Sequence, residues 1–148
     1  MANLTGSSTA EINAPLADVW ALVADVERAP EWQGGMRSLT AIERDDRNRG
    51  MLCNIEVDAR VAAIKATLRF TYEEPERLSW VQERGDIKSI RGAWELESLG
   101  EQRTRARYWV EVDVGRLGLL IRGPIVSVLR DQLAGRRAGE LKQAVERA

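Results

Sequence analysis

The stretch INAPLADVWALVADVERAPEW, residues 12–32, organises the first part of the chain. Its Ala14-Pro15 step predicts a helix start, because proline is tolerated at the first helical position. Four apolar residues then recur at the spacing of one helix face: Leu16, Val19, Trp20 and Val23. This spacing predicts an amphipathic helix that ends near Asp25 and follows a short strand over residues 6–13. A second short helix is expected over residues 26–30, and the glycine pair at 34–35 marks a turn.

Residues 36–113 alternate between apolar and polar side chains with a period of two. The clearest run is residues 64–73, in which every position obeys the alternation of a strand with one buried face. Turn-rich breaks separate the runs, at residues 45–50, 74–76, 85–86 and 100–101. Six strands joined by such short connections predict an antiparallel meander.

Residues 117–145 return to helical spacing and carry an apolar stripe from Leu117 to Val145. Gly123-Pro124 should kink or restart this helix, because proline removes a backbone donor. The basic residues of this segment are expected on its outer flanks: Arg130, Arg136, Arg137 and Lys142. A sheet with one apolar face has to cover that face, and this long helix is the only element large enough. The predicted fold class is α+β, with a seven-stranded antiparallel sheet wrapped around the C-terminal helix in a single domain over residues 1–148.

The composition excludes several classes of site. The chain has no histidine and one cysteine, Cys53, so it cannot build a Ser-His-Asp triad, a Cys-His pair or a usual zinc site. With 22 basic and 23 acidic residues it has no electrostatic footprint for nucleic acid. No apolar run approaches the roughly 18 residues of a membrane span, and residues 1–11 lack a signal-peptide core. We therefore expect a cytoplasmic protein that is not an integral membrane protein and needs no metal or cofactor; nothing in the sequence indicates its oligomeric state.

Residues 12–32 resemble the opening signature of the START-like (SRPBCC) superfamily, which includes polyketide cyclase/dehydrase-like proteins, coenzyme Q-binding proteins and lipid-transfer domains. Leu78-Ser79-Trp80, residues 92–96 (GAWEL) and the run from Thr104 into Tyr108 support this resemblance, which covers essentially the whole chain. The resemblance implies a helix-grip fold, in which the sheet grips the C-terminal helix around a hydrophobic cavity. The order of elements predicted from periodicity agrees with it.

The candidate cavity lining consists of apolar residues whose strand parity faces the C-terminal helix. They are Ile55, Val57, Leu68, Phe70, Leu78, Trp80, Trp94, Tyr108 and Val110, and the helix would add Leu120, Pro124 and Val128. Such a composition suits a ligand pocket, although the same residues could pack together as ordinary core. The resemblance places Trp32 near the cavity mouth, where it could equally plug the barrel end. Gln82 shares the parity of Trp80 and is either a polar anchor in the cavity or a residue at the solvent edge.

Three functions compete. The favoured one is a non-catalytic carrier or sensor of a hydrophobic small molecule such as a lipid, quinone or polyketide, because the inward face is apolar and no catalytic constellation is visible. The second is an aromatase/cyclase acting on a poly-β-ketone, in which Arg, Tyr or water would move protons. The third is a protein-interaction module that uses a surface around Trp109, which has outward parity and could pack against an arginine. Fold alone does not choose among them.

Overall fold

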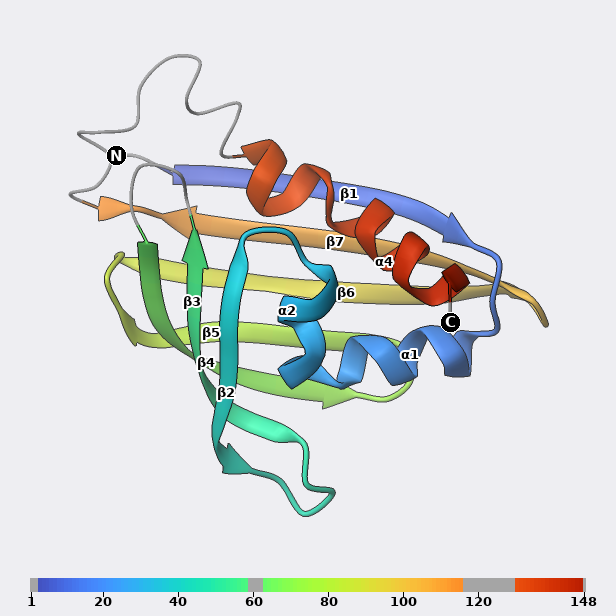
Figure 1. Ribbon diagram of the computed structural model, residues 1–148, viewed down its shortest axis with the longest axis horizontal. Helices are drawn as coiled ribbons and strands as arrows, with labels where there is room; N and C mark the ends of the chain where they lie inside the picture. The colour runs from blue at the N-terminus through green and yellow to red at the C-terminus, as the bar shows by residue number, and fades with distance from the viewer. Residues whose placement is uncertain (1–2, 59–62, 116–129, 148) are drawn as a thin grey trace.

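The protein is described by a computed structural model, which covers residues 3–58, 63–115 and 130–147 (Figure 1). The chain forms a strand, three short helical segments, six further strands and a C-terminal helical region. The elements are β1 (Asn3–Ile12), α1 (Leu16–Ala24), the 3₁₀ turn η1 (Val26–Arg28), α2 (Ala29–Trp32), β2 (Met36–Arg44), β3 (Gly50–Asp58), β4 (Ala63–Glu73), β5 (Arg77–Gly85), β6 (Ser89–Gly100), β7 (Arg103–Asp113), the π turn η3 (Asp131–Gly135) and α4 (Arg137–Arg147).

The seven strands form one antiparallel sheet in the order β1-β7-β6-β5-β4-β3-β2. Strands β2 to β7 are neighbours in the order of the chain, and β1 pairs with β7 from Asn3↔Asp113 to Ile12↔Thr104. This arrangement confirms the predicted α+β helix-grip fold, with its seven-stranded antiparallel sheet and its short helices between the first two strands.

The sheet is strongly twisted and bent. Figure 1 shows β2 and β3 running across the direction of β6 and β7. Register shifts interrupt the β2–β3 pair at three points and the β4–β5 pair at Thr67/Leu68. An extra residue on one strand increases the local twist and bends the strand, so these shifts help the sheet to curl around its inner face.

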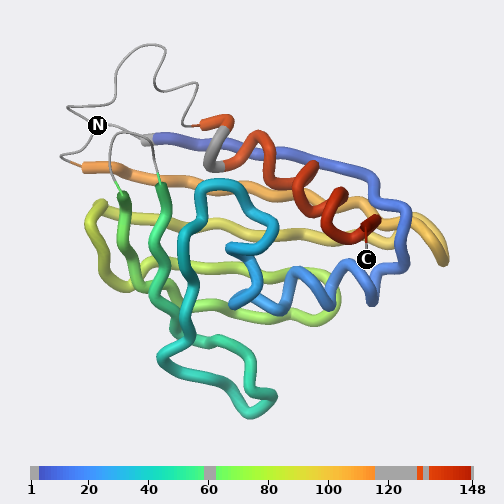
Figure 2. The backbone as a smooth tube through the Cα atoms, viewed as in Figure 1, coloured from blue at the N-terminus to red at the C-terminus, as the bar shows by residue number. Residues whose placement is uncertain are grey.

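Helices α1, α2 and α4 all cover the same face of the sheet (Figures 1 and 2). Helix α1 begins directly after Pro15, and it buries Val19, Trp20 and Val23, the stripe expected from their spacing. Helix α4 lies along β1 and also contacts β7, α1 and α2. The first part of the predicted C-terminal helix, including Gly123-Pro124, lies outside the described residues; the described part begins at Arg130 and contains the π turn η3.

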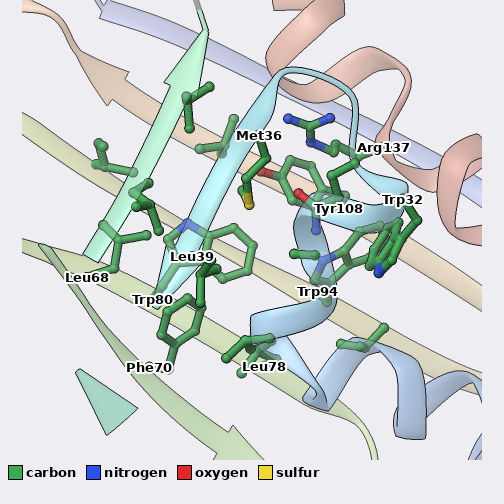
Figure 3. A pocket seen from close by; sticks show the side chains of 18 of the residues that line it. Trp32, Met36, Leu39, Leu68, Phe70, Leu78, Trp80, Trp94, Tyr108 and Arg137 are labelled. Atoms are coloured by element: carbon green, nitrogen blue, oxygen red, sulfur yellow. The ribbon is translucent and has the colours of Figure 1, made fainter. Parts of the chain in front are cut away.

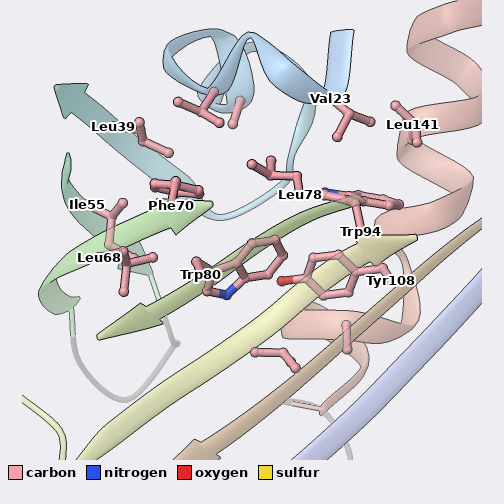
Figure 4. Close-up of a cluster of buried hydrophobic side chains, with 14 of the residues drawn as sticks. Val23, Leu39, Ile55, Leu68, Phe70, Leu78, Trp80, Trp94, Tyr108 and Leu141 are labelled. Atoms are coloured by element: carbon pink, nitrogen blue, oxygen red, sulfur yellow. The ribbon is translucent and has the colours of Figure 1, made fainter. Parts of the chain in front are cut away.

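A continuous apolar core lies between the sheet and the helices. Figure 4 shows Val23 and Leu141 from the helices facing Leu78, Trp94 and other residues of the inner sheet face. Trp94, Leu78 and Leu141 are almost fully buried, at 2%, 2% and 0% exposure. Cys53, the single cysteine of the chain, is also buried.

Candidate ligand pocket

The core is not completely filled: a pocket opens between the inner face of the sheet and the segments around η1, α2 and α4 (Figure 3). Its cavity volume is about 100 Å³. Ten residues that the sequence predicted as lining belong to its wall: Trp32, Ile55, Val57, Leu68, Phe70, Leu78, Trp80, Trp94, Tyr108 and Val110. The nine of these residues that lie on strands come together because alternate side chains of a strand point to the same face of the sheet. Leu120, Pro124 and Val128 lie outside the described residues.

Five aromatic rings form a continuous line along the pocket. Trp32 lies 6.0 Å from Trp94, and Trp94 meets Tyr108 edge-on at 4.8 Å, measured between ring centroids. Tyr108 then lies 5.5 Å from Trp80, and Trp80 lies 6.1 Å from Phe70. All of these separations fall in the range that favours tilted or edge-to-face ring pairs. Three of the five tryptophans of the chain therefore lie in this line.

Gln82 does not belong to the pocket wall, although its parity suggested it. Its Nε2 donates a hydrogen bond to the carbonyl oxygen of Ile87 at 2.9 Å, so the side chain is held against the β5–β6 connection. A backbone carbonyl in such a connection has no strand partner and needs a donor. Gln82 is half-buried and its Oε1 is buried, so the structure does not show the alternative position at the solvent edge either.

Arg137 is the residue whose predicted position is wrong. The sequence places it on the outer flank of the last helix, but it is only 2% exposed and belongs to the pocket wall. One signal was available: Arg137 precedes the fully buried Leu141 by four residues, and such pairs share a helix face. The charge of Arg137 argued for an exposed position instead, because charged side chains are almost never fully buried without a partner.

The burial of Arg137 is possible because its charge is paired. Its Nη1 donates to Glu140 Oε1 at 2.8 Å and to the carbonyl oxygen of Gly34 at 2.8 Å. Glu140 in turn accepts a hydrogen bond from the Gly34 N–H at 2.9 Å through its second oxygen, Oε2. Arg137 and Glu140 thus form a neutral pair that joins α4 to the turn after α2.

The π turn η3 sets the direction of α4. Within it the Arg136 N–H donates to the carbonyl of Asp131, five residues back, at 3.2 Å. The extra residue of a π turn shifts the phase of the following helix by about 100°. Ser8 of β1 satisfies the freed backbone groups, since its hydroxyl donates to the Ala134 carbonyl at 2.7 Å and accepts from the Ala138 N–H at 3.0 Å. The helix that carries Arg137 is therefore fixed by the first strand.

The polar atoms of the pocket wall are mainly donors. Burial raises the pKa of the Tyr108 hydroxyl, although the charge of Arg137 and a hydrogen bond from it act in the opposite direction. The hydroxyl therefore stays protonated at neutral pH and can donate. Arg137 Nε and Trp32 Nε1 are buried and have no hydrogen-bond acceptor within the described part of the chain. Buried donors without a partner are rare in native proteins, so their presence on a pocket wall indicates a site for an acceptor.

The described residues contain no group of three or more His, Cys, Asp or Glu side chains that could hold a metal ion. They also contain no helix long and apolar enough to cross a bilayer.

Trp109 is half-buried and lies on the outer face of the sheet, as the outward parity of Trp109 predicted. The Arg91 guanidinium lies 5.9 Å from the centroid of the Trp109 ring. The exposed large apolar residues within the described ranges are Ile42, Val81 and Leu99, and Trp109 is not among them.

Comparison with known proteins decides the family. The sequence profile of the polyketide cyclase / dehydrase and lipid transport family matches residues 12–137. The chain belongs to this family. The match begins at the end of β1 and ends at Arg137, so it includes both the opening signature and the buried arginine. The resemblance inferred from residues 12–32 is confirmed.

Solved structures with the same fold agree with this membership. A START superfamily protein from Mycobacterium smegmatis superimposes with a TM-score of 0.82 at 20% identity, over 97% of both chains. The Zhui aromatase/cyclase from Streptomyces sp. R1128 gives 0.74 at 18% identity, over 99% of this chain and 95% of that one. The protein TTHA0849 from Thermus thermophilus gives 0.78 at 18% identity, over 96% of this chain and 97% of that one. No curated protein matches the sequence significantly. These TM-scores show that this family member shares its fold with the three proteins.

Proposed function

We propose that the protein binds a hydrophobic small molecule, such as a lipid, a quinone or a polyketide-like compound, in the pocket between the sheet and the helices, as a carrier or sensor. The observation that carries the proposal is the line of five aromatic rings beside an unfilled space. Small-molecule sites are concave, mostly apolar and rich in aromatic side chains, with a few placed polar groups. The pocket has this composition.

Packing energetics support a ligand over ordinary core. Protein interiors are normally filled to the density of organic crystals, and an empty apolar space lowers stability in proportion to its volume. The side chains around this space are themselves buried, including Leu68 at 4% and Phe70 at 6% exposure. A fold that keeps large apolar side chains buried and still leaves space between them gains stability when an apolar molecule occupies that space.

A route into the pocket is available beside α2. Asp25 and Trp32 belong both to the pocket wall and to the wall of a surface groove between α1, α2 and the end of α4. Trp32 is half-buried and belongs to a helix of four residues, so its ring can move with little disturbance to the sheet. A ligand would enter from this groove and meet Trp32 first.

The proposal is tested by isolating the protein from cells and analysing it by native mass spectrometry, followed by solvent extraction and identification of the bound compound. Leu68→Trp should fill the pocket from β4 and abolish the bound mass. Val81→Trp is the matched control, because Val81 is 51% exposed on the neighbouring strand β5 and lies outside the pocket wall. A protein that carries no compound and takes up none from a lipid extract would contradict the proposal.

A second candidate is a polyketide aromatase/cyclase. The specific observation in its favour is the pair of donors, Tyr108 and Arg137, beside the apolar wall, since donors aimed at a carbonyl oxygen stabilise the charge that develops there during enolisation. The Zhui aromatase/cyclase shares the fold. Incubation with reactive poly-β-ketones of several chain lengths should then give aromatic products faster than the protein-free reaction. Equal rates with and without protein would exclude this activity.

A further inference from the structure

The pocket has two chemically different ends. Figure 3 shows Arg137, Tyr108 and Trp32 on the side of α2 and α4, while Leu68 and Phe70 lie on the opposite side, on β4. The β4 end is apolar; the α4 end carries the two buried donors without acceptors, Arg137 Nε and Trp32 Nε1, together with the Tyr108 hydroxyl. An apolar molecule with a polar group at one end would therefore bind in a single orientation, with the polar group at α4.

The unpaired atoms determine the kind of polar group. Arg137 Nε and Trp32 Nε1 can only donate, because neither nitrogen has a free lone pair. A buried donor without an acceptor is unfavourable, so a ligand that supplies an acceptor at this place is favoured. A ligand hydroxyl or amine would bring a further donor to the α4 end, where the protein already supplies Arg137 Nε, Trp32 Nε1 and the Tyr108 hydroxyl. The site thus favours an oxygen that only accepts.

The charges determine whether that oxygen is ionised. Arg137 is already paired with Glu140 at 2.8 Å, so the α4 end has no net charge. The other charged residue of the pocket wall is Asp25, which is exposed at the mouth and carries a negative charge. A carboxylate moved into this pocket would lose its hydration without gaining an unpaired cation, and it would have to pass Asp25. A neutral carbonyl oxygen meets neither obstacle.

We propose that Arg137 and Tyr108 form a head-group subsite that selects an uncharged carbonyl oxygen, such as that of a ketone, quinone or ester, and orients the apolar remainder of the ligand toward Leu68 and Phe70. Glu140 is a positioning residue, because it accepts a hydrogen bond from Arg137 Nη1 and does not belong to the pocket wall. This inference rests on the proposed function, since it assigns the chemistry of a ligand in the same pocket.

The test compares three naphthalene probes of nearly equal size and shape: 2-acetylnaphthalene, 2-ethylnaphthalene and 2-naphthoate. Their dissociation constants are measured by isothermal titration calorimetry with the wild-type protein and with three variants. The key quantity is the ratio of the dissociation constant of the ethyl compound to that of the acetyl compound. Arg137→Met and Tyr108→Phe should each lower this ratio about tenfold, the value of one lost hydrogen bond to a buried donor. Tyr72→Phe is the matched control, because the Tyr72 hydroxyl donates to the Gly50 carbonyl at 2.6 Å, outside the pocket wall, and its loss should leave the ratio unchanged.

The outcomes separate this inference from the proposed function. In the wild type the acetyl compound should bind more tightly than 2-naphthoate. Tightest binding of 2-naphthoate would show recognition of an anion and overturn the inference, and so would a ratio that neither variant changes. Both of these results would leave the pocket as a ligand site. Failure of all three probes to bind would contradict the proposed function itself. If Arg137→Met does not fold, the ratio can still be measured with Tyr108→Phe, because this variant retains the Arg137–Glu140 pair.

Discussion

The indole ring of Trp80 lies directly against the backbone of Gly92, its register partner on the adjacent strand β6. A Cβ atom at position 92 would lie 2.7 Å from Trp80 Cζ2 and 2.6 Å from the Trp109 carbonyl oxygen. Carbon atoms do not approach so closely without displacement. The missing side chain at position 92 is what allows Trp80 to lie between Phe70 and Tyr108 in the aromatic line.

Gly92→Ala should therefore destabilise the protein by about 1–3 kcal/mol, the usual result of overpacking a filled site. Urea denaturation followed by tryptophan fluorescence measures the change, and the displaced Trp80 should also alter the native emission spectrum. Gly139→Ala is the matched control: Gly139 lies in α4 with no atom within 4 Å of its added Cβ, so the same substitution should stabilise by up to about 1 kcal/mol. Equal stability of the two variants would contradict this account of Trp80.

Ser8→Ala should destabilise the protein by about 1–2 kcal/mol and loosen α4. The substitution removes one hydroxyl that serves two backbone groups, the Ala134 carbonyl and the Ala138 N–H, at the point where the π turn leaves them without helical partners. Thermal unfolding measures the stability, and hydrogen exchange should show faster exchange of the Ala138 amide. Ser7→Ala on the same strand is the control, because Ser7 is exposed and its loss should change neither quantity.

Thr104→Val tests the connection between β7 and the entrance of α1. The Thr104 hydroxyl is completely buried and donates to the Ala14 carbonyl at 2.9 Å. Valine has nearly the same shape, so the substitution leaves the carbonyl without its donor and should cost about 1–3 kcal/mol in the free energy of unfolding. Thr71→Val on β4, where the side chain is exposed, should change the free energy by less than about 0.5 kcal/mol. A loss of similar size in both variants would mean that strand propensity, and not the hydrogen bond, is responsible.

Cys53 should be unreactive toward thiol reagents while the protein is folded. Burial raises the pKa of its thiol to about 11, so very little reactive thiolate exists at pH 8. In denaturant the thiol should react at the rate of an ordinary cysteine, whose pKa is about 8.5. Because the unfolded chain loses this proton first, the contribution of Cys53 to stability is complete below about pH 8.5 and decreases as the pH rises toward 11. Reaction with Ellman's reagent at about pH 8 checks the reactivity, and urea denaturation between about pH 8 and 11 checks the dependence of stability on pH; rapid reaction of the folded protein at about pH 8 would refute the first statement, and a stability that does not fall above about pH 8.5 would refute the second.

Most of the strand residues in the pocket wall could be predicted from the sequence, because alternate residues of a strand point to the same face. Leu68 and Phe70 are two residues apart on β4, and no register shift falls between them, so both face the pocket. The same rule brought Trp80 and Trp94 to one wall from separate strands. The rule failed for Gln82, whose parity is correct but whose amide binds the Ile87 carbonyl of the adjoining connection.

The polar end of the pocket was harder to predict because it depends on a helical irregularity. A π turn leaves no periodic signature in the sequence, and its extra residue changes which side chains of α4 face the sheet. The charge of Arg137 predicts the outer flank, whereas its position relative to Leu141 points inward. The partner that permits this burial, Glu140, is three residues away on the same helix. In the sequence, this spacing cannot be distinguished from that of an ordinary ion pair on a helix surface.

The hydroxyl of Ser8 links the two ends of the chain, since its hydrogen bond with the Ala138 N–H spans 130 positions. Among homologues, positions 8, 134 and 138 should consequently change together: chains with a hydroxyl at position 8 should keep the π turn, and chains without one should continue as a regular α-helix. In the second group the inward polar residue would move to a neighbouring position along the helix. The same coupling has a practical side, because a truncation or fusion that disturbs the first strand would alter the direction of Arg137 at the far end of the sequence.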